Sequence, residues 1–308
     1  MPKLRLLLVA LTSCLLSACS PFLYLNAFSS AKQSREQTDI AYGALPRQRL
    51  DVYLPTPPPA HQTQVVVFFY GGGWDSGSRT DYRFVGRALS ARGFITIIPD
   101  YRIYPEVLFP AFVEDAAAAV AWTLGNVSRF CGSDSQVFLM GHSAGAHIAA
   151  MLALDEKFLQ SKGLRPQQLA GWIGLSGPYD FLPLKSQRLK RILGDPAPKS
   201  TQPIEFVTRS APPALLITGD DDTVVRPANT QRLSERLQQA GSEVREIIYP
   251  GVGHGRTVAA FSGIANGLPI VDETVRFMLE HRAKPRDEQR PCVESDASAG
   301  LAVTYKAL

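Results

Sequence analysis

The chain of 308 residues has few cysteines, no cluster of like charges and no long apolar run. Four cysteines, 24 glycines and 23 prolines exclude a disulfide-dense, collagen-like or low-complexity protein. The 32 lysines and arginines barely exceed the 28 acidic residues and are spread along the chain, so no nucleic-acid partner is expected. His142 and His147 are five residues apart, which does not fit a helical metal site. We therefore expect neither a metal nor another cofactor.

The first eighteen residues have the pattern of an export signal. Lys3 and Arg5 precede an apolar run over residues 6–16, which is too short to span a bilayer comfortably. Leu16-Ser17-Ala18-Cys19 resembles the lipobox of bacterial lipoproteins, which implies that Cys19 carries lipid and becomes the first mature residue. Ser20 follows the cysteine, which in that group favours the outer membrane. An ordinary cleaved signal or an uncleaved anchor remains the alternative to this membrane-anchored, exported protein.

Two cysteines remain for other roles. Cys14 lies in the signal and Cys19 in the lipobox, which leaves Cys131 and Cys292. Disulfides persist in exported proteins, so these two can pair and tie the tail to the domain. Two unrelated cysteines are the equal alternative.

Strand and helix patterns alternate from residue 48 onward. Residues 65–70 are apolar throughout, which is typical of a strand buried on both faces. The patterns predict strands over 48–54, 65–70, 94–98, 136–140, 170–175, 214–218 and 243–249, and helices over 81–92, 111–124, 144–155, 229–240 and 270–282. This alternation predicts an α/β fold in which helices cover both faces of a mostly parallel sheet of about eight strands.

A serine motif lies between a predicted strand and a predicted helix. Gly141-His142-Ser143-Ala144-Gly145 follows the strand that ends at Met140. Small residues two positions before and after Ser143 allow a sharp strand-to-helix turn that exposes its hydroxyl at the helix N-terminus. The motif therefore predicts that Ser143 is a nucleophile rather than a structural serine.

A second glycine motif ends the first buried strand. Tyr70-Gly71-Gly72-Gly73-Trp74 follows residues 65–69. Glycines allow backbone N–H groups to approach an anionic oxygen, so Gly72 and Gly73, with the N–H of Ala144, can form an oxyanion hole. Alone the motif would be a simple turn, but the serine motif about seventy residues later favours the catalytic interpretation.

A serine nucleophile needs a base, and the base needs an orienting carboxylate. Of the five histidines, only His254 lies in a loop of small residues after a predicted strand. Asp220, Asp221 and Asp222 follow the strand at 214–218, and Asp180 follows the strand at 170–175. All four aspartates are therefore candidates for the acid.

These motifs together resemble the α/β-hydrolases of the esterase and lipase group that have an HGGGW-type oxyanion motif. The resemblance covers about residues 48–282 and includes Asp100-Tyr101-Arg102 and Gly219-x-x-Asp222-x-x-Val225. That second spacing implies Asp222 as the acid, and Asp180 is then expected to be a loop anchor. The chain departs from the group at Tyr70, where many relatives have histidine. Because backbone groups hold the anion, this implies a change in loop packing and pocket shape rather than in the reaction.

The resemblance implies a serine carboxylesterase that acts on small-molecule esters. Residues 181–210 can form a small cap but contain no long apolar lid, which favours soluble esters of short acyl chains over lipid droplets. Tyr70 and Trp74 are expected at the substrate pocket, although Trp74 is equally compatible with the core. An amide-cleaving relative, such as an arylformamidase or peptidase, is the alternative. A non-enzymatic surface binding protein is less favoured because the motif set is complete.

The resemblance also divides the chain. It implies an α/β-hydrolase catalytic domain at 47–282, and the residue patterns add a signal peptide at 1–18, a linker at 19–46 and a weakly ordered tail at 283–308. No sequence signal indicates an oligomeric state.

Overall fold

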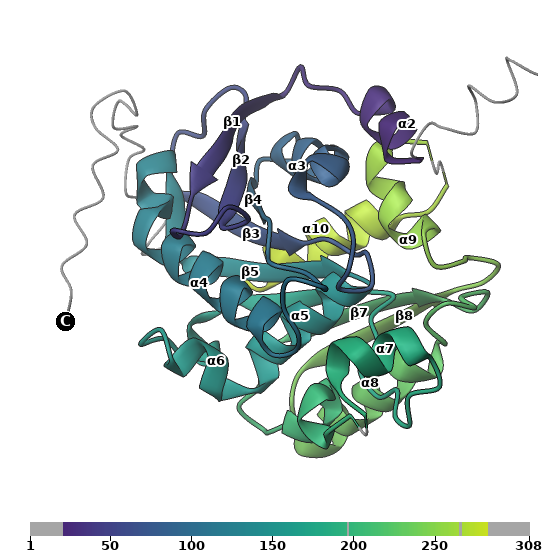
Figure 1. Cartoon of the computed structure of the whole chain (residues 1–308). Helices are drawn as coiled ribbons and strands as arrows, with labels where there is room; N and C mark the ends of the chain where they lie inside the picture. Colours follow the sequence, from purple (N-terminus) through teal and green to yellow (C-terminus); the bar gives the residue numbers. More distant parts are fainter. Residues whose placement is uncertain (1–20, 196, 265–266, 283–308) are drawn as a thin grey trace, which may run out of the picture.

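The computed structural model describes residues 21–195, 197–264 and 267–282, which form an α/β fold around one eight-stranded sheet (Figure 1). The strands are β1 (Ser34–Ala41), β2 (Arg49–Pro55), β3 (Thr63–Phe69), β4 (Ile95–Pro99), β5 (Gly132–His142), β6 (Gly171–Leu175), β7 (Ala214–Gly219) and β8 (Val244–Tyr249). Their order is β1-β2-β4-β3-β5-β6-β7-β8. β2 is antiparallel to both its neighbours, and all other pairs are parallel.

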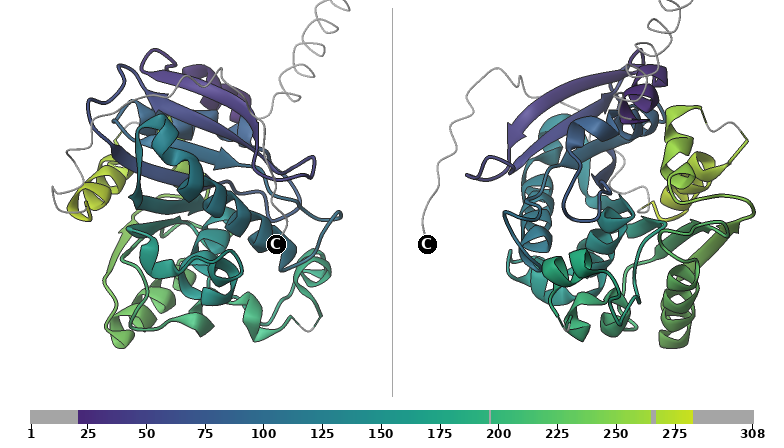
Figure 2. Two further views of the ribbon diagram at one scale, coloured as in Figure 1. Left: turned by 90° about the vertical axis from the view of Figure 1, so that its left-hand side faces the viewer. Right: turned by 45° about the vertical axis from the view of Figure 1, so that its right-hand side comes forward.

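Helices cover both faces of this sheet (Figures 1 and 2). The α-helices are α2 (Pro21–Phe28), α3 (Arg83–Ser90), α4 (Ala111–Asn126), α5 (Ala144–Leu154), α6 (Glu156–Gln160), α7 (Gln187–Leu193), α8 (Ala228–Ala240), α9 (Arg256–Ala259) and α10 (Ile270–Glu280). Short 3-10 helices include η1 (Arg79–Tyr82), η4 (Lys199–Thr201), η5 (Pro203–Phe206) and η6 (Ala260–Ser262). α3 and α10 lie on one face, and α4, α5 and α8 lie on the other.

The core explains why these elements form where they do. Every residue of α5 is buried, and β3 is buried from its second residue to its end. The small side chains of α4 and α5 allow both helices to pack closely on the sheet and on each other. The predicted α/β architecture is thus confirmed, including the continuous burial of the apolar strand at 65–69.

The predicted linker over residues 19–46 is wrong for the residues that the structure describes. Residues 34–41 form β1, an edge strand that pairs antiparallel with β2, and residues 21–28 form α2. No residue of β1 is fully buried, and its mostly polar sequence does not alternate between apolar and polar residues. The pattern that normally marks a strand is therefore missing. The folded part of the chain therefore includes these residues.

Several predictions concern residues outside the described part. The signal peptide, the lipobox Cys19, Cys292 and the tail at 283–308 all lie there. Cys131 is described and is disulfide-bonded, while its predicted pairing with Cys292 stays a prediction. Within the described ranges, no helix has the length and apolar character needed to cross a membrane.

Candidate active site

Ser143 lies in a sharp turn between β5 and α5. Its φ of 56° and ψ of −122° are strained for a residue with a side chain. The turn is held by a hydrogen bond from the Ser143 N–H to Leu175 O in β6 (2.9 Å). This geometry exposes the hydroxyl at the start of a helix, as the serine motif predicts.

The glycines that flank Ser143 are required by close backbone contacts. A Cβ on Gly141 would lie 2.2 Å from Gly145 O, and a Cβ on Gly145 would lie 2.0 Å from Phe69 O at the end of β3. Any larger residue would push β3 away from the turn between β5 and α5, which we call the elbow, so the G-x-S-x-G spacing follows from packing.

Three loops at the carboxyl edge of the sheet bring the predicted residues together. Ser143 follows β5, Asp222 follows β7 and His254 follows β8. His254 Nε2 lies 2.9 Å from Ser143 Oγ, and His254 Nδ1 lies 2.8 Å from Asp222 Oδ2. The side chain of Asp222 is fully buried, whereas His254 is 16% exposed. A hydrogen-bonded chain thus runs from the buried carboxylate to the accessible hydroxyl.

The other candidate acids lie in different contacts. Asp180 forms an ion pair with Arg232 (2.5 Å), and Asp220 Oδ1 accepts from the Gly251 N–H (2.6 Å). Neither contacts His254 in the described residues. The geometry therefore agrees with the G-x-x-D-x-x-V spacing, which pointed to Asp222.

The electrostatics of the pair fix the histidine tautomer. Burial alone would raise the pKa of Asp222, but hydrogen bonds from His254 and the Val225 N–H outweigh burial and hold this pKa below its usual value. An ionised Asp222 accepts from His254 Nδ1–H, which leaves Nε2 with the lone pair that accepts from the Ser143 hydroxyl. The arrangement can draw a proton from Ser143.

Residues that the sequence analysis gave no role hold His254 in place. Its carbonyl accepts hydrogen bonds from Thr257 Oγ1 (2.9 Å) and from His142 Nε2 (3.1 Å). Thr257 Oγ1 also lies 3.1 Å from the buried Ser176 Oγ. Burial and the neighbouring His254 lower the pKa of His142 to about 3, so its ring is neutral. In the sequence, the only sign of this support was a threonine three residues after His254, close enough for its hydroxyl to reach the His254 carbonyl.

The glycine loop after β3 lies against the elbow. Gly72 and Gly73 have φ values of 129° and 58°, which favour glycine. The Gly72 carbonyl accepts hydrogen bonds from the N–H groups of Asp75 and Ser76. Among the residues that the structure describes, the N–H groups of Gly72 and Gly73 have no backbone hydrogen-bond acceptor. The Ala144 N–H begins α5 and has no partner within that helix. Three backbone donors are thus available.

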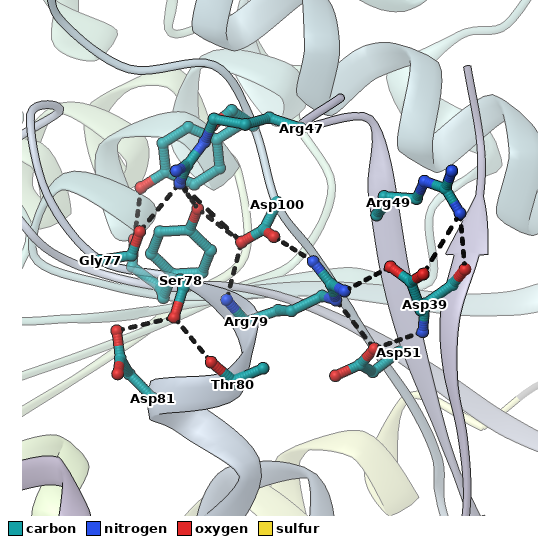
Figure 3. A network of polar contacts seen from close by, with 12 residues as sticks. Asp39, Arg47, Arg49, Asp51, Gly77, Ser78, Arg79, Thr80, Asp81 and Asp100 are labelled. Carbon is teal, nitrogen blue, oxygen red and sulfur yellow. Dashed lines mark hydrogen bonds and ion pairs between the residues drawn. The ribbon is translucent and has the colours of Figure 1, made fainter. Parts of the chain in front are cut away.

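A network of charged side chains supports the segment that follows this loop (Figure 3). Arg79 Nε donates to Asp51 Oδ1 (2.8 Å), and its backbone N–H donates to Asp100 Oδ1 (2.7 Å). Arg47 Nη2 donates to the carbonyl of Gly77 (2.8 Å). Asp51 and Asp100 are buried, and these partners offset the free-energy cost of removing each carboxylate from water. The network ties the end of the glycine loop to β2.

Tyr70 belongs to this network, and its predicted place at the substrate pocket stays a prediction. Its side chain is fully buried, and its ring stacks on Tyr101 at 4.6 Å. Its hydroxyl donates to Asp100 Oδ1 (2.9 Å) and accepts from Arg47 (2.9 Å). Burial raises the pKa of Tyr70 far above its usual value, so the hydroxyl keeps its proton.

Trp74 lies in an aromatic cluster beneath the loop. It is 3% exposed and stacks on Phe112 (6.1 Å) and Phe181 (6.2 Å), with the ring of His147 edge-on at 5.1 Å. Burial lowers the pKa of His147 to about 4. The cluster forms an apolar, uncharged region beside the site.

The segment after β6 packs against this cluster through Phe181. Its helix α7 carries Arg188, which forms an ion pair with Asp75 and donates from Nη2 to Gly73 O (3.2 Å). These contacts connect α7 to the glycine loop directly. Over the described residues, no group of three or more His, Cys, Asp or Glu side chains could hold a metal ion.

The sheet, the turn at Ser143 and the three converging loops are those of an α/β-hydrolase. Within that class the chain belongs to the BD-FAE family of esterases, whose family model matches residues 50–237. It is 31% identical over 237 residues to the esterase LipC of Mycobacterium tuberculosis, a match that covers 70% of this chain and 59% of LipC. It is 30% identical over 269 residues to the isoprenylcysteine alpha-carbonyl methylesterase ICME of Arabidopsis thaliana, which covers 80% of this chain and 62% of that protein.

Solved structures share the fold. A truncated carbohydrate esterase from gut microbiota has a TM-score of 0.72 at 21% identity, and the match covers 82% of this chain and 98% of that chain. Propionate-bound Thermogutta terrifontis esterase 2 has a TM-score of 0.67 at 22% identity, with 82% and 95% covered. The chain spans about three fifths of the length of the two curated relatives named above.

Proposed function

We propose that the protein is a serine carboxylesterase that hydrolyses soluble esters of short acyl chains through an acyl-enzyme. The observation that carries the proposal is the hydrogen-bonded chain from Asp222 through His254 to Ser143, with distances of 2.8 and 2.9 Å, beside a glycine loop with available N–H groups. Membership of an esterase family supports the same reaction.

The acylation step follows from these positions. His254 Nε2 takes the proton of Ser143 as Oγ attacks the ester carbonyl, and the ionised Asp222 stabilises the resulting imidazolium. The N–H groups of Gly72, Gly73 and Ala144 donate to the oxyanion. Collapse of the tetrahedral intermediate breaks the C–O bond, and His254 passes its proton to the leaving alcohol. The acyl group then remains on Ser143.

Deacylation repeats the sequence with water. His254 takes a proton from water as the oxygen attacks the acyl carbonyl, and returns it to Ser143 Oγ as the carboxylic acid leaves. The neutral His142 next to His254 adds no positive charge that would oppose formation of the imidazolium.

Short acyl chains suit the enclosure of the site. The Arg188 ion pair holds α7 against the glycine loop, and Trp74 and its aromatic neighbours fill the space beneath it. Solved structures of Thermogutta terrifontis esterase 2 contain propionate or butyrate. Cleavage of a formamide or peptide bond by the same residues is the second candidate.

The test is a substrate panel with matched variants. Wild-type protein should hydrolyse p-nitrophenyl acetate and butyrate faster than long-chain esters, aryl formamides or peptides. Ser143→Ala and His254→Ala should each lose about 10⁴-fold or more in kcat, and Asp222→Asn about 10⁴-fold. Asp180→Asn is the control, since its loss of the Arg232 ion pair should leave kcat nearly unchanged. Turnover retained in Ser143→Ala, or a folded wild type without esterase activity, would contradict the mechanism.

We further propose that the protein is exported and held in the outer membrane by lipid on Cys19. The basic start, the apolar run and the lipobox in residues 1–19 support this proposal. Cys19→Ser should move the protein from the membrane fraction to the soluble periplasmic fraction, because multiple acyl chains anchor where a single chain would not. Fractionation that does not change in Cys19→Ser would refute it.

A further inference from the structure

The helix α2 is fixed to the domain through one face. Phe22 packs on Tyr82 of η1 with ring centroids 4.8 Å apart. The Asn26 amide donates to the carbonyls of Thr80 (3.1 Å) and Asp81 (3.0 Å), and its oxygen accepts from the Phe84 N–H (3.0 Å). These contacts set the orientation of α2, so its opposite face is held outward.

That opposite face is apolar and uncovered. Leu23, Tyr24 and Phe28 are 60%, 45% and 68% exposed, and we call these three residues the α2 patch. Ile264, which follows η6 beside α2, is 46% exposed. Single exposed apolar residues are ordinary, but three in one helix of eight residues are not. A helix without a charged side chain that is apolar on both sides normally has both sides covered.

We propose that the α2 patch docks on the surface of a lipid bilayer. The argument rests on the proposed lipid anchor: two peptide units separate Cys19 from Pro21, which limits the distance between their Cα atoms to about 7 Å. Lipid attached at Cys19 therefore places the first turn of α2 at the level of the lipid headgroups. At that level the leucine and phenylalanine enter the acyl region, and Tyr24 takes the interfacial position that tyrosine favours.

Docking through α2 also orients the catalytic end of the domain. α2 packs on η1, which continues the glycine loop, and lies beside η6 and α9, which continue the His254 loop (Figure 1). In Figure 1 α7 lies in the lower part of the molecule, well below α2 at its top. The bilayer therefore meets the domain at η1 and η6, the ends of these loops that α2 contacts, whereas α7 contacts the glycine loop at its other end, at Gly73 and Asp75.

The direct test introduces one tryptophan into the patch and another at a matched control position. Phe28→Trp and Leu108→Trp full-length proteins are reconstituted into vesicles of phosphatidylethanolamine and phosphatidylglycerol with brominated acyl chains. Leu108 is 52% exposed and lies beside α7, because the next residue bonds to Ile192. The three native tryptophans are common to both variants and to wild type, so subtracting the wild-type signal leaves the emission of the introduced side chain.

The two variants should then differ in the emission of that side chain. In Phe28→Trp the introduced indole should be quenched and its emission shifted to the blue, while in Leu108→Trp it should be neither. Equal quenching in the two variants, or none in either, would overturn the proposal.

A second measurement removes the lipid and asks what the patch contributes. In a Cys19→Ser background, the Leu23→Asp, Phe28→Asp double variant should bind the same vesicles at least about ten-fold more weakly than its parent. Leu108→Asp should bind like the parent, and melting temperatures confirm that each variant is folded. Vesicle binding that is unchanged in the double variant would refute the proposal. A parent protein that forms a dimer, which the double variant abolishes, would also refute it, because a second copy of the chain would then cover the α2 patch. Hydrolysis of soluble esters by wild type is scored separately, so a failure of the proposed esterase function is recognised independently.

Discussion

Replacing Gly145 by alanine tests whether packing at the elbow controls both stability and reactivity. The new Cβ would lie 2.0 Å from Phe69 O and 2.5 Å from Tyr70 O, where ordinary Cβ atoms stay beyond 3.0 Å. Both neighbours are backbone atoms, so relief requires β3 and α5 to separate by about 1 Å, the difference between 3.0 and 2.0 Å. The glycine loop continues directly from β3, so the same movement displaces the proposed oxyanion donors from Ser143.

The expected magnitudes can be separated. Alanine in place of glycine inside a helix gains about 1 kcal/mol, while forced overpacking costs about 1–3 kcal/mol, so the net loss of unfolding free energy is about 0–2 kcal/mol. Misplacement of reacting groups by about 1 Å costs about 100-fold in rate. Gly145→Ala should therefore lose much more kcat than stability.

Urea unfolding and kcat on p-nitrophenyl butyrate measure the two effects. Gly125→Ala is the matched control, because Gly125 lies in α4 and a Cβ there meets nothing within 4 Å. This control should gain up to about 1 kcal/mol and keep its kcat. Wild-type kcat in Gly145→Ala, with the domain folded, would refute the link between elbow packing and the oxyanion donors.

Three further predictions concern buried groups. The pKa of His147 is lowered to about 4 in the folded protein, so between pH 6.5 and 4 the unfolded chain binds one more proton than the folded chain. The free energy of unfolding should therefore fall by up to about 1.4 kcal/mol for each pH unit of acidification in this range. His147→Phe should reduce this slope in urea titrations. Tyr70→Phe removes one of the donors to the buried Asp100, which keeps its bonds to Arg79, and should lower the unfolding free energy by about 1.5–3 kcal/mol, the range for a hydrogen bond to a charged group; a stability equal to wild type would contradict that role. Non-reducing mass mapping should recover Cys131 joined to Cys292, and in urea without reductant Cys292→Ser should make the otherwise buried Cys131 open to alkylation; the bridge contributes up to about 5 kcal/mol on the chain-entropy model.

Much of the fold could be predicted from local sequence patterns. Continuous apolar strands such as β3 and small-residue helices such as α4 are visible in a single window, because their burial is uniform. The elbow was equally visible, since the contacts that require Gly141 and Gly145 lie in one turn and the strand beside it. The polar edge strand β1 was not, because half-buried residues on both its faces leave no period to read.

The place of Tyr70 could not be read because its partners are remote in sequence. Its hydroxyl bonds to Asp100, 30 residues later, and to Arg47, 23 residues earlier. Similarly, the contact of Arg188 with Asp75 spans 113 residues. Sequence patterns reveal which residues are chemically suited to a site, whereas such pairings depend on how distant loops meet.

The strand order also determines when the site comes into being as the chain folds. From β5 onward, each new strand is added to the sheet in the order of the sequence, ending with β8. The serine turn is complete once β6 pairs, because the Ser143 N–H bonds to Leu175 O, yet His254 arrives 111 residues after the serine. On the proposed mechanism, a chain that emerges from its N-terminus therefore carries an inert serine until its last strand has docked. The proposed mechanism thus makes hydrolysis depend on the last strand of the sheet, even though the serine turn forms earlier in the sequence.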